Sequence, residues 1–307
     1  MQFKAQDISN NNVITLEASK TLYDVRNILL KYNIGRVVIL KESRKENKVP
    51  VGIITEKDIV RFLFTEFPKR RLDEIRADEV TKNQNLITAK EDRDLSMCAK
   101  LMLDNHISSL IITTYNDGSF ILRGILTKSD LLDAYSKSYG GDVAINEYMT
   151  KRVLTVNPDE SVHIVLLIMA DGNVSRVIVV EDNSSKNNKT KPIGIITSHD
   201  LLPASTLLLA DRTTPYTQVK QDWPRIKQGD LFSGGKSNLP WGMKRILLAQ
   251  DIMTSNLVMI TDYADLIDAS LIMKGNKISG LPVVNSEDNL VGIITKTDIT
   301  RAIADGR

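Results

Sequence analysis

A threonine followed three residues later by an aspartate recurs at four places, and both side chains can hold a polar ligand. The hydroxyl can donate to a phosphate oxygen, and the carboxylate can accept both hydroxyls of a ribose. If a helix begins there, its free backbone N–H groups also favour a phosphate. The same pair can simply cap that helix. Capping and nucleotide binding are compatible, and the candidates are Thr55 and Asp58, Thr127 and Asp130, Thr197 and Asp200, and Thr295 and Asp298.

A glycine precedes each of these threonines by three residues. Glycine weakens a strand unless something must approach its backbone closely. Capping does not explain this position, so the glycines predict a close approach there. We therefore add them to the candidate ligand site, as Gly52, Gly124, Gly194 and Gly292.

The elements that position these residues follow from a nine-residue pattern: apolar, Gly, two apolar, Thr, two variable, Asp, apolar. Its copies are residues 51–59, 123–131, 193–201 and 291–299. In the first copy we expect strands at 13–16, 36–40 and 51–55, a helix capped by Ser19, and a helix from Asp58. Each copy thus predicts a strand-helix-strand-strand-helix repeat that leans on its neighbours to bury its apolar faces.

Four further segments carry a family resemblance, namely residues 107–112, 145–150, 249–260 and 278–284. Together with the fourfold pattern, they resemble CBS domains, named after cystathionine β-synthase. The resemblance implies an α/β fold of four β-α-β-β-α repeats paired into two Bateman modules. This is the arrangement of the γ subunit of AMP-activated kinase and of stand-alone prokaryotic CBS proteins. The repeats are expected at 5–67, 75–137, 145–206 and 248–305, with an insert at 207–247.

The resemblance also implies a ligand, because such modules bind adenine nucleotides or S-adenosylmethionine between paired repeats. We expect AMP, ADP or ATP, with S-adenosylmethionine less favoured. Arg36 and Arg176 begin the second strands of repeats 1 and 3, where the family often places cations facing phosphate; a solvated strand end is the alternative. The equivalent positions in repeats 2 and 4 are Ser109 and Gly280. The adenine ring would be flanked by Ile14, Ile87, Leu154 and Met259, which otherwise belong to the core.

Other polar residues carry weaker signals. Lys128 and Lys296 lie beside two of the corners, where we expect solvated surface. His199 lies inside the third corner and could touch a ligand, whereas His106 and His163 are expected to be structural. The histidines form no metal pattern, and no catalytic arrangement of side chains stands out. We therefore expect neither a metal site nor an enzyme.

Composition limits the class of protein. The 307 residues carry 40 Lys and Arg against 38 Asp and Glu, a net charge of +2 that does not indicate a nucleic-acid binder. The single cysteine, Cys98, excludes an internal disulfide and suits a reducing compartment. The longest apolar runs, residues 162–170 and 201–210, are shorter than the ~20 residues of a membrane span. We expect a soluble, cytoplasmic protein.

Two functions remain. The first is a non-catalytic sensor of adenine nucleotides that changes the pairing of its modules to control a partner, either a second copy or another protein. The second is an RNA- or ribosome-associated factor, suggested by basic residues at 69–71 and 186–191 and by an insert holding Trp223, Trp241 and Lys236. Residues 230–237 of that insert lack the spacing of a phosphate-binding Walker loop.

Overall fold

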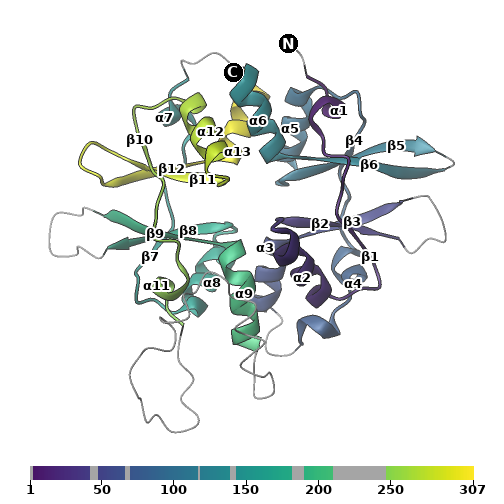
Figure 1. The fold of residues 1–307 in the computed structure, drawn as a ribbon, viewed down its shortest axis with the longest axis horizontal. Helices are drawn as coiled ribbons and strands as arrows, with labels where there is room; N and C mark the ends of the chain where they lie inside the picture. Colours follow the sequence, from purple (N-terminus) through teal and green to yellow (C-terminus); the bar gives the residue numbers. More distant parts are fainter. Residues whose placement is uncertain are drawn as a thin grey trace, which may run out of the picture.

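The computed structural model of the chain describes residues 3–41, 48–65, 70–116, 118–138, 143–181, 190–209 and 247–307. The insert expected at 207–247 lies almost entirely outside these residues, and so do its two tryptophans and Lys236. The described residues form four similar units placed as quadrants around the middle of the molecule (Figure 1). We number these units as repeats 1 to 4 in chain order.

Each repeat is a three-stranded sheet with two helices. The first and second strands are parallel, and the second and third are antiparallel. This confirms the predicted strand-helix-strand-strand-helix order. Repeat 1 is β1 Thr15–Glu17, α2 Leu22–Tyr32, β2 Arg36–Leu40, β3 Pro50–Thr55 and α3 Glu56–Thr65, and repeat 2 is β4 Thr88–Ala89, α5 Leu95–Asp104, β5 Ser109–Asn116, β6 Ser119–Thr127 and α6 Lys128–Ser138. Repeat 3 is β7 Thr155–Val156, α8 Val162–Asp171, β8 Arg176–Glu181, β9 Lys191–Thr197 and α9 Ser198–Leu209, and repeat 4 is β10 Ile260–Thr261, α12 Leu266–Gly275, β11 Gly280–Val284, β12 Leu290–Thr295 and α13 Lys296–Asp305.

Three local expectations need correction. Helix α2 is capped by Thr21, whose hydroxyl accepts from the Asp24 amide, and not by Ser19. The last helix of each repeat begins directly after its threonine, so the aspartate is the third helical residue rather than the first. The first strands begin two or three residues later than predicted, and the four candidate adenine-flanking residues each lie immediately before a strand.

A short helix leads into each repeat and packs on the neighbouring repeat of its pair. These lead-in helices are α1 Ala5–Ile8, α4 Ala77–Thr81 (preceded by the 3₁₀ turn η1 Leu72–Glu74), α7 Ile145–Tyr148 and α11 Ala249–Ile252. The amide of Ala5 donates to Arg93 O of repeat 2, and the amide of Ala77 donates to Lys20 O of repeat 1. The same exchange joins repeats 3 and 4. The chain is therefore two modules, 1–2 and 3–4, each held together by swapped segments.

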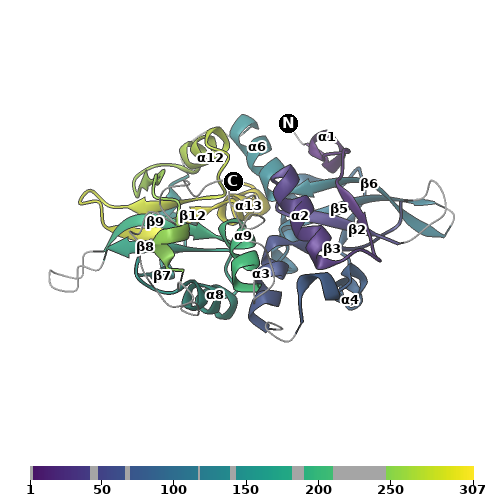
Figure 2. The same cartoon turned by 60° about the horizontal axis from the view of Figure 1, so that its bottom comes forward.

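The modules meet along a seam at which repeat 1 faces repeat 3 and repeat 2 faces repeat 4. Helices α3 and α9 lie side by side in one half of the seam, and α6 and α13 in the other (Figures 1 and 2). Repeats 2 and 4 share a single apolar core. Repeats 1 and 3 keep separate cores, and each contributes one side chain to the core of the other. Val60 packs in the core of repeat 3, and Leu202 packs in the core of repeat 1.

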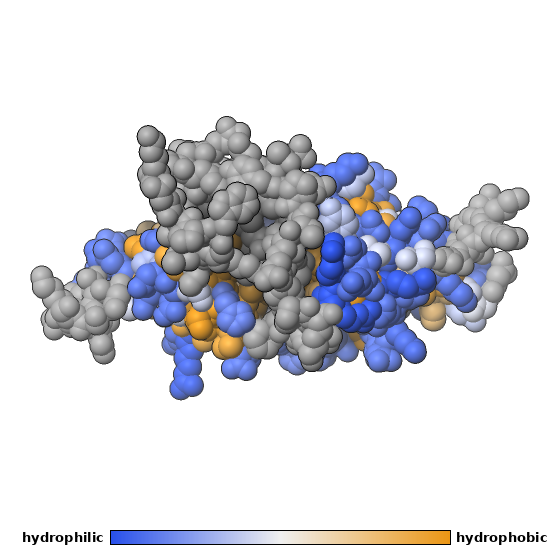
Figure 3. Space-filling model, turned by 90° about the horizontal axis from the view of Figure 1, so that it is seen from below, coloured by the Kyte–Doolittle hydropathy of each residue, from blue (hydrophilic) through white to orange (hydrophobic). Residues whose placement is uncertain are grey.

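The described surface is mostly hydrophilic when the molecule is seen from below, with apolar side chains gathered in a small area of its left half (Figure 3). Helix α8, which belongs to that half, exposes Ile164 and Leu167. Among the described residues, no helix combines the length and the apolar character that crossing a bilayer requires.

Candidate functional site

The four threonine-aspartate corners are helix caps in every repeat. The amide and the hydroxyl of each threonine both donate to the Oδ2 atom of its aspartate, over distances of 2.6 to 2.9 Å. The predicted capping role is thus confirmed. The cap engages Oδ2 and leaves Oδ1 outside it, and an ionised carboxylate has lone pairs enough for further donors. The proposed role with a ribose is compatible with this geometry and remains a prediction.

The close approach expected at the four glycines is present, but protein atoms make it. A Cβ atom on Gly52 would collide with Thr81, and one on Gly194 would collide with Met253. At Gly292 it would lie 2.7 Å from Met149 Sδ, and at Gly124 2.9 Å from Asn11 Oδ1. Each neighbour belongs to the segment leading into the paired repeat. Module pairing therefore accounts for the close approach at the glycines, and their assignment to a ligand site stays a prediction.

Arg36 and Arg176 reach across their modules toward the paired repeat. The Nη1 atom of Arg36 donates to Ser108 O over 2.5 Å. The guanidinium of Arg176 lies over Gly280, where any side chain would occupy its place. The alternation in the sequence thus has a geometric meaning, since an arginine from an odd repeat needs a small residue opposite it in the even repeat.

Burial shapes the charges around both arginines. It lowers the pKa of Arg176 to about 10, while Asp298 opposes that change. It also lowers the pKa of Arg36, against the attraction of Glu56 and Asp130. Burial raises the pKa of both aspartates, Asp130 and Asp298, and the cap hydrogen bonds oppose it. Each arginine therefore faces the corner aspartate of the even repeat in its own module.

Lys128 and Lys296 do not lie on a solvated surface, and that expectation was wrong. They are the first residues of α6 and α13, and they cross the seam in opposite directions. The Nζ atom of Lys128 donates to Thr297 Oγ1 over 3.0 Å, and that of Lys296 donates to Ser129 Oγ over 2.8 Å. Burial, with both arginines nearby, lowers the pKa of each lysine to about 8.

These four side chains form what we call the central cation cluster: Arg36, Lys128, Arg176 and Lys296. Each repeat contributes one member, and the four cations outnumber the three carboxylates that interact with them, Asp130, Asp298 and Glu56. The N-termini of α6 and α13 bring their partial positive charge to the same place. Half-buried cations in excess over carboxylates favour an anion with several oxygens.

The odd half of the seam has a different chemistry. Glu56 Oε1 lies 2.6 Å from His199 Nδ1, so a hydrogen bond joins the corners of repeats 1 and 3. His199 thus contacts the protein, and the suggested ligand contact stays a prediction. His106 and His163, expected to be structural, are exposed. The corners of repeats 2 and 4 are the ones that contribute lysines to the central cation cluster.

The four candidate adenine-flanking residues differ in exposure. Leu154 and Met259 are each 39% exposed, so apolar surface is available beside the corners of repeats 3 and 4. Ile14 and Ile87 are half-buried, and Ile87 packs against the core shared by repeats 2 and 4. The stacking role of all four stays a prediction.

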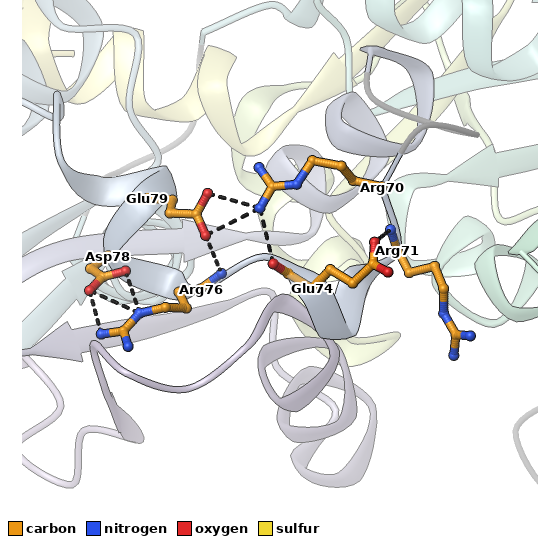
Figure 4. A network of polar contacts seen from close by, with 6 residues as sticks. All are labelled: Arg70, Arg71, Glu74, Arg76, Asp78 and Glu79. Carbon is orange, nitrogen blue, oxygen red and sulfur yellow. Dashed lines mark hydrogen bonds and ion pairs between the residues drawn. The ribbon is translucent and has the colours of Figure 1, made fainter.

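The basic cluster that suggested a nucleic-acid contact is neutralised where the structure describes it. Figure 4 shows Arg70 bonded to Glu79, and Arg76 to Asp78, within the linker between repeats 1 and 2. Arg71 pairs with Asp73 at 3.1 Å. Neighbouring carboxylates thus offset much of the positive charge of these exposed arginines, and the nucleic-acid alternative stays a prediction. Lys69 and Lys186 lie outside the described residues.

One cross-repeat contact gave no sequence signal. The side-chain amide of Gln84 donates to Ile53 O and accepts from Ile53 N, at 2.9 and 3.0 Å. At the equivalent places the other three repeats use backbone pairs, such as Asn10 with Ile125. The role of Lys128 and Lys296 was only weakly indicated by the sequence, in that each is the first residue of the last helix in an even repeat. In the part of the chain that the structure describes, no three potential metal ligands come together.

The fold and the site define a class: tandem β-α-β-β-α repeats, paired by swapped segments, with cations gathered at the centre. The model of the CBS domain matches residues 5–65, 77–137, 145–206 and 249–305. The chain belongs to the CBS-domain family.

Relatives of full length are known. The uncharacterized protein MJ1225 of Methanocaldococcus jannaschii is 24% identical over 96% of both chains. Its crystal structure, named there as a proposed archaeal homolog of g-AMPK, covers 98% of this chain and 100% of its own with a TM-score of 0.72 at 21% identity. A conserved protein of Pyrococcus horikoshii gives a TM-score of 0.60 at 19% identity, covering 98% of this chain and 100% of its own. These likenesses establish the shared fold.

Another relative is a larger protein. MJ1404 of M. jannaschii is 29% identical over 59% of this chain but only 37% of its own length. The chain thus matches little more than a third of that relative.

Proposed function

We propose that the chain is a non-catalytic regulatory protein that binds adenosine phosphates at the corners of repeats 2 and 4. One observation carries the proposal: the central cation cluster draws one cation from each repeat and holds more cations than carboxylates. Asp130 and Asp298 would accept the ribose hydroxyls through Oδ1, and Thr127 and Thr295 would lie near the phosphate.

The charge of the cluster favours AMP, ADP or ATP over S-adenosylmethionine. Burial and, after it, the two nearby arginines lower the pKa of each lysine to about 8, so their positive charges are already costly. A phosphate relieves that cost, whereas a sulfonium cation adds to it. The corners of repeats 1 and 3 face no member of the cluster from their partner repeats, which offer Ser109 and Gly280 instead, and they are the weaker candidates.

A ligand at the centre would act on the seam. Because the cations come from both modules, an anion there pulls on all four repeats, and it would favour the module arrangement in which the cations converge. It shifts the arrangement only by its difference in affinity for the two states. The surface altered by this shift would be read by a partner, either a second copy or another protein.

The test is isothermal titration calorimetry with AMP, ADP, ATP, adenosine and S-adenosylmethionine. Asp130→Ala and Asp298→Ala should each weaken binding by ~10-fold or more, because each substitution removes a carboxylate that would accept hydrogen bonds from the ligand. Asp58→Ala and Asp200→Ala are matched controls, because they remove the same kind of cap without touching an even corner. They should leave the affinity within ~2-fold.

Two results would count against the proposal. The first is that no adenosine compound binds the full chain. The second is that the odd-repeat variants lose as much affinity as the even-repeat ones, which would move the site to repeats 1 and 3.

A further inference from the structure

A cavity of about 370 Å³ opens at the odd half of the seam, away from the central cation cluster. It lies between α3 of repeat 1 and the C-terminal end of α8 of repeat 3. Val60, Met169, Ala170 and Val174 form its apolar part. Val60 and Met169 are almost fully buried members of the core of repeat 3. This volume falls within the range of small-molecule pockets.

The polar side of the cavity is cationic. Lys57 and Arg61 lie one turn apart on α3. Asn173 lies two residues beyond the end of α8 and has a left-handed conformation. The Nζ atom of Lys57 donates to Asn173 O over 2.7 Å, which fixes the ammonium at the cavity. Burial lowers the pKa of Lys57, so this charge is partly withdrawn from water. No carboxylate is among the lining residues.

The sequence encodes this opening through small side chains. In each repeat, a residue with left-handed backbone follows the helix between the first two strands, and Ala170 precedes that residue of repeat 3 by three positions. The same position in the other repeats holds a larger residue: Leu30, Leu103 and Lys274. The position of Val60 in repeat 3 is Leu202, which is fully buried in repeat 1. In repeat 4, Lys274 pairs with Asp133 across the seam. Three of four equivalent places are therefore occupied by larger side chains, and the place at Ala170 holds a cavity.

We propose that this cavity is a second ligand site that binds a small amphipathic anion, with an apolar body on Ala170 and Val174 and one carboxylate or phosphate on Lys57 and Arg61. Charge complementarity and an apolar floor select this class together, since neither a neutral apolar molecule nor a free inorganic anion uses both parts. The occupant contacts repeats 1 and 3 at once and so bridges the two modules. None of its lining residues belongs to the central cation cluster, so the occupant would not compete with a nucleotide at the even-repeat corners.

The experiment is calorimetric titration of the full chain with 2-naphthoate, 2-naphthyl phosphate and neutral 2-naphthamide, with and without saturating AMP. We expect one anion per chain at submillimolar to millimolar affinity, and at least ~10-fold weaker binding of the amide. Comparing the two anions decides between a carboxylate and a phosphate head. Ala170→Leu should abolish this binding and leave the response to AMP unchanged.

Further variants separate the cavity from a general loss of structure. Val60→Leu introduces the residue found at the equivalent position of repeat 3 and should weaken binding of the anions by ~10-fold. Lys57→Gln should weaken binding of the anions by ~5- to 10-fold without affecting binding of the amide. Leu30→Ala, at the equivalent place, is the control and should leave anion binding within ~2-fold. Competition between the anions and AMP, equal binding of the amide, or full binding by both Ala170→Leu and Val60→Leu would overturn the proposal.

Discussion

Two lysines at the centre of the molecule carry charges that burial makes costly. The pKa of Lys128 and of Lys296 falls from the ordinary value to about 8, with burial as the main cause. Between pH 8 and about 10.4, the unfolded chain holds more protons than the folded chain, so the free energy of unfolding rises with pH across that window. Below pH 8, both lysines are charged and their full cost is present. Such a cost persists where a binding site needs the charge.

Replacing these lysines tests separately their effect on stability and their effect on AMP binding. Lys128→Met and Lys296→Met should each raise the free energy of unfolding at pH 7, because a costly partly buried charge is removed. Each should also weaken AMP binding by ~10-fold or more, because a charge-assisted hydrogen bond to the ligand is lost. For the unaltered chain, AMP affinity should fall as the pH rises from 7 to 9. Denaturant unfolding and calorimetry measure the two effects.

Lys137 offers the control for that experiment, since its side chain is 60% exposed and pairs with Asp133 on the surface. Lys137→Met should change neither quantity appreciably. If the seam lysines behaved like Lys137, they would be surface residues after all.

The lead-in helices are the elements that make two repeats into one module. Each lies on the last strand of the paired repeat, and the strand offers a glycine where the segment passes. At Gly52 and Gly194 a methyl group has no room, because Thr81 and Met253 occupy its place. The nine-residue pattern therefore serves two elements at once: the threonine and aspartate start a helix, and the glycine admits a segment from the other repeat.

Adding a methyl group at these glycines should loosen the module. Gly52→Ala and Gly194→Ala should each cost ~1–3 kcal/mol of unfolding free energy through overpacking. Gly275→Ala is the comparison, because a Cβ there meets nothing within 4 Å and alanine favours a helix end over glycine. That variant should be neutral or slightly stabilising in the same chemical denaturation series, and equal losses at all three positions would contradict the role given to the lead-in segments.

The sequence predicted what is local. The four corners, the order of elements and the arginine alternation follow from residues close together in the chain. The partner of each glycine did not follow, since the pattern signals a close approach without naming what approaches. Nor did the burial of Lys128 and Lys296, whose partners Thr297 and Ser129 lie across the seam. The Gln84 amide pair depends in the same way on a contact between repeats.

At the scale of the molecule, the two halves of the seam differ in strength. Repeats 2 and 4 share one apolar core, whereas repeats 1 and 3 are joined by exchanged side chains, the hydrogen bond between Glu56 and His199 and a buried arginine. Arg26 of α2 is 1% exposed, and its Nε atom donates to Leu202 O of α9 over 3.0 Å. Opening of the modules should therefore begin in the odd half, with repeats 2 and 4 acting as the hinge.

Arg26→Met tests this asymmetry. The substitution keeps an apolar stem of similar length but removes a buried charged hydrogen bond, which is worth ~1.5–3 kcal/mol. Amide hydrogen exchange should speed up in α3 and α9 and stay unchanged in α6 and α13. Equal acceleration in both halves would show that the seam opens as a whole.

The swapped lead-in segments also dictate an order of events in folding. Helix α1 bonds to Arg93 and, just beyond it, Asn10 pairs with Ile125, so the start of the chain finds its place only after more than a hundred further residues have been made. The corresponding segment of repeat 3 likewise waits for repeat 4. Such distant pairings raise contact order and slow the search. A nascent chain thus completes its first half as a pair of repeats or not at all, and a single repeat expressed alone lacks the strand on which its own first helix lies.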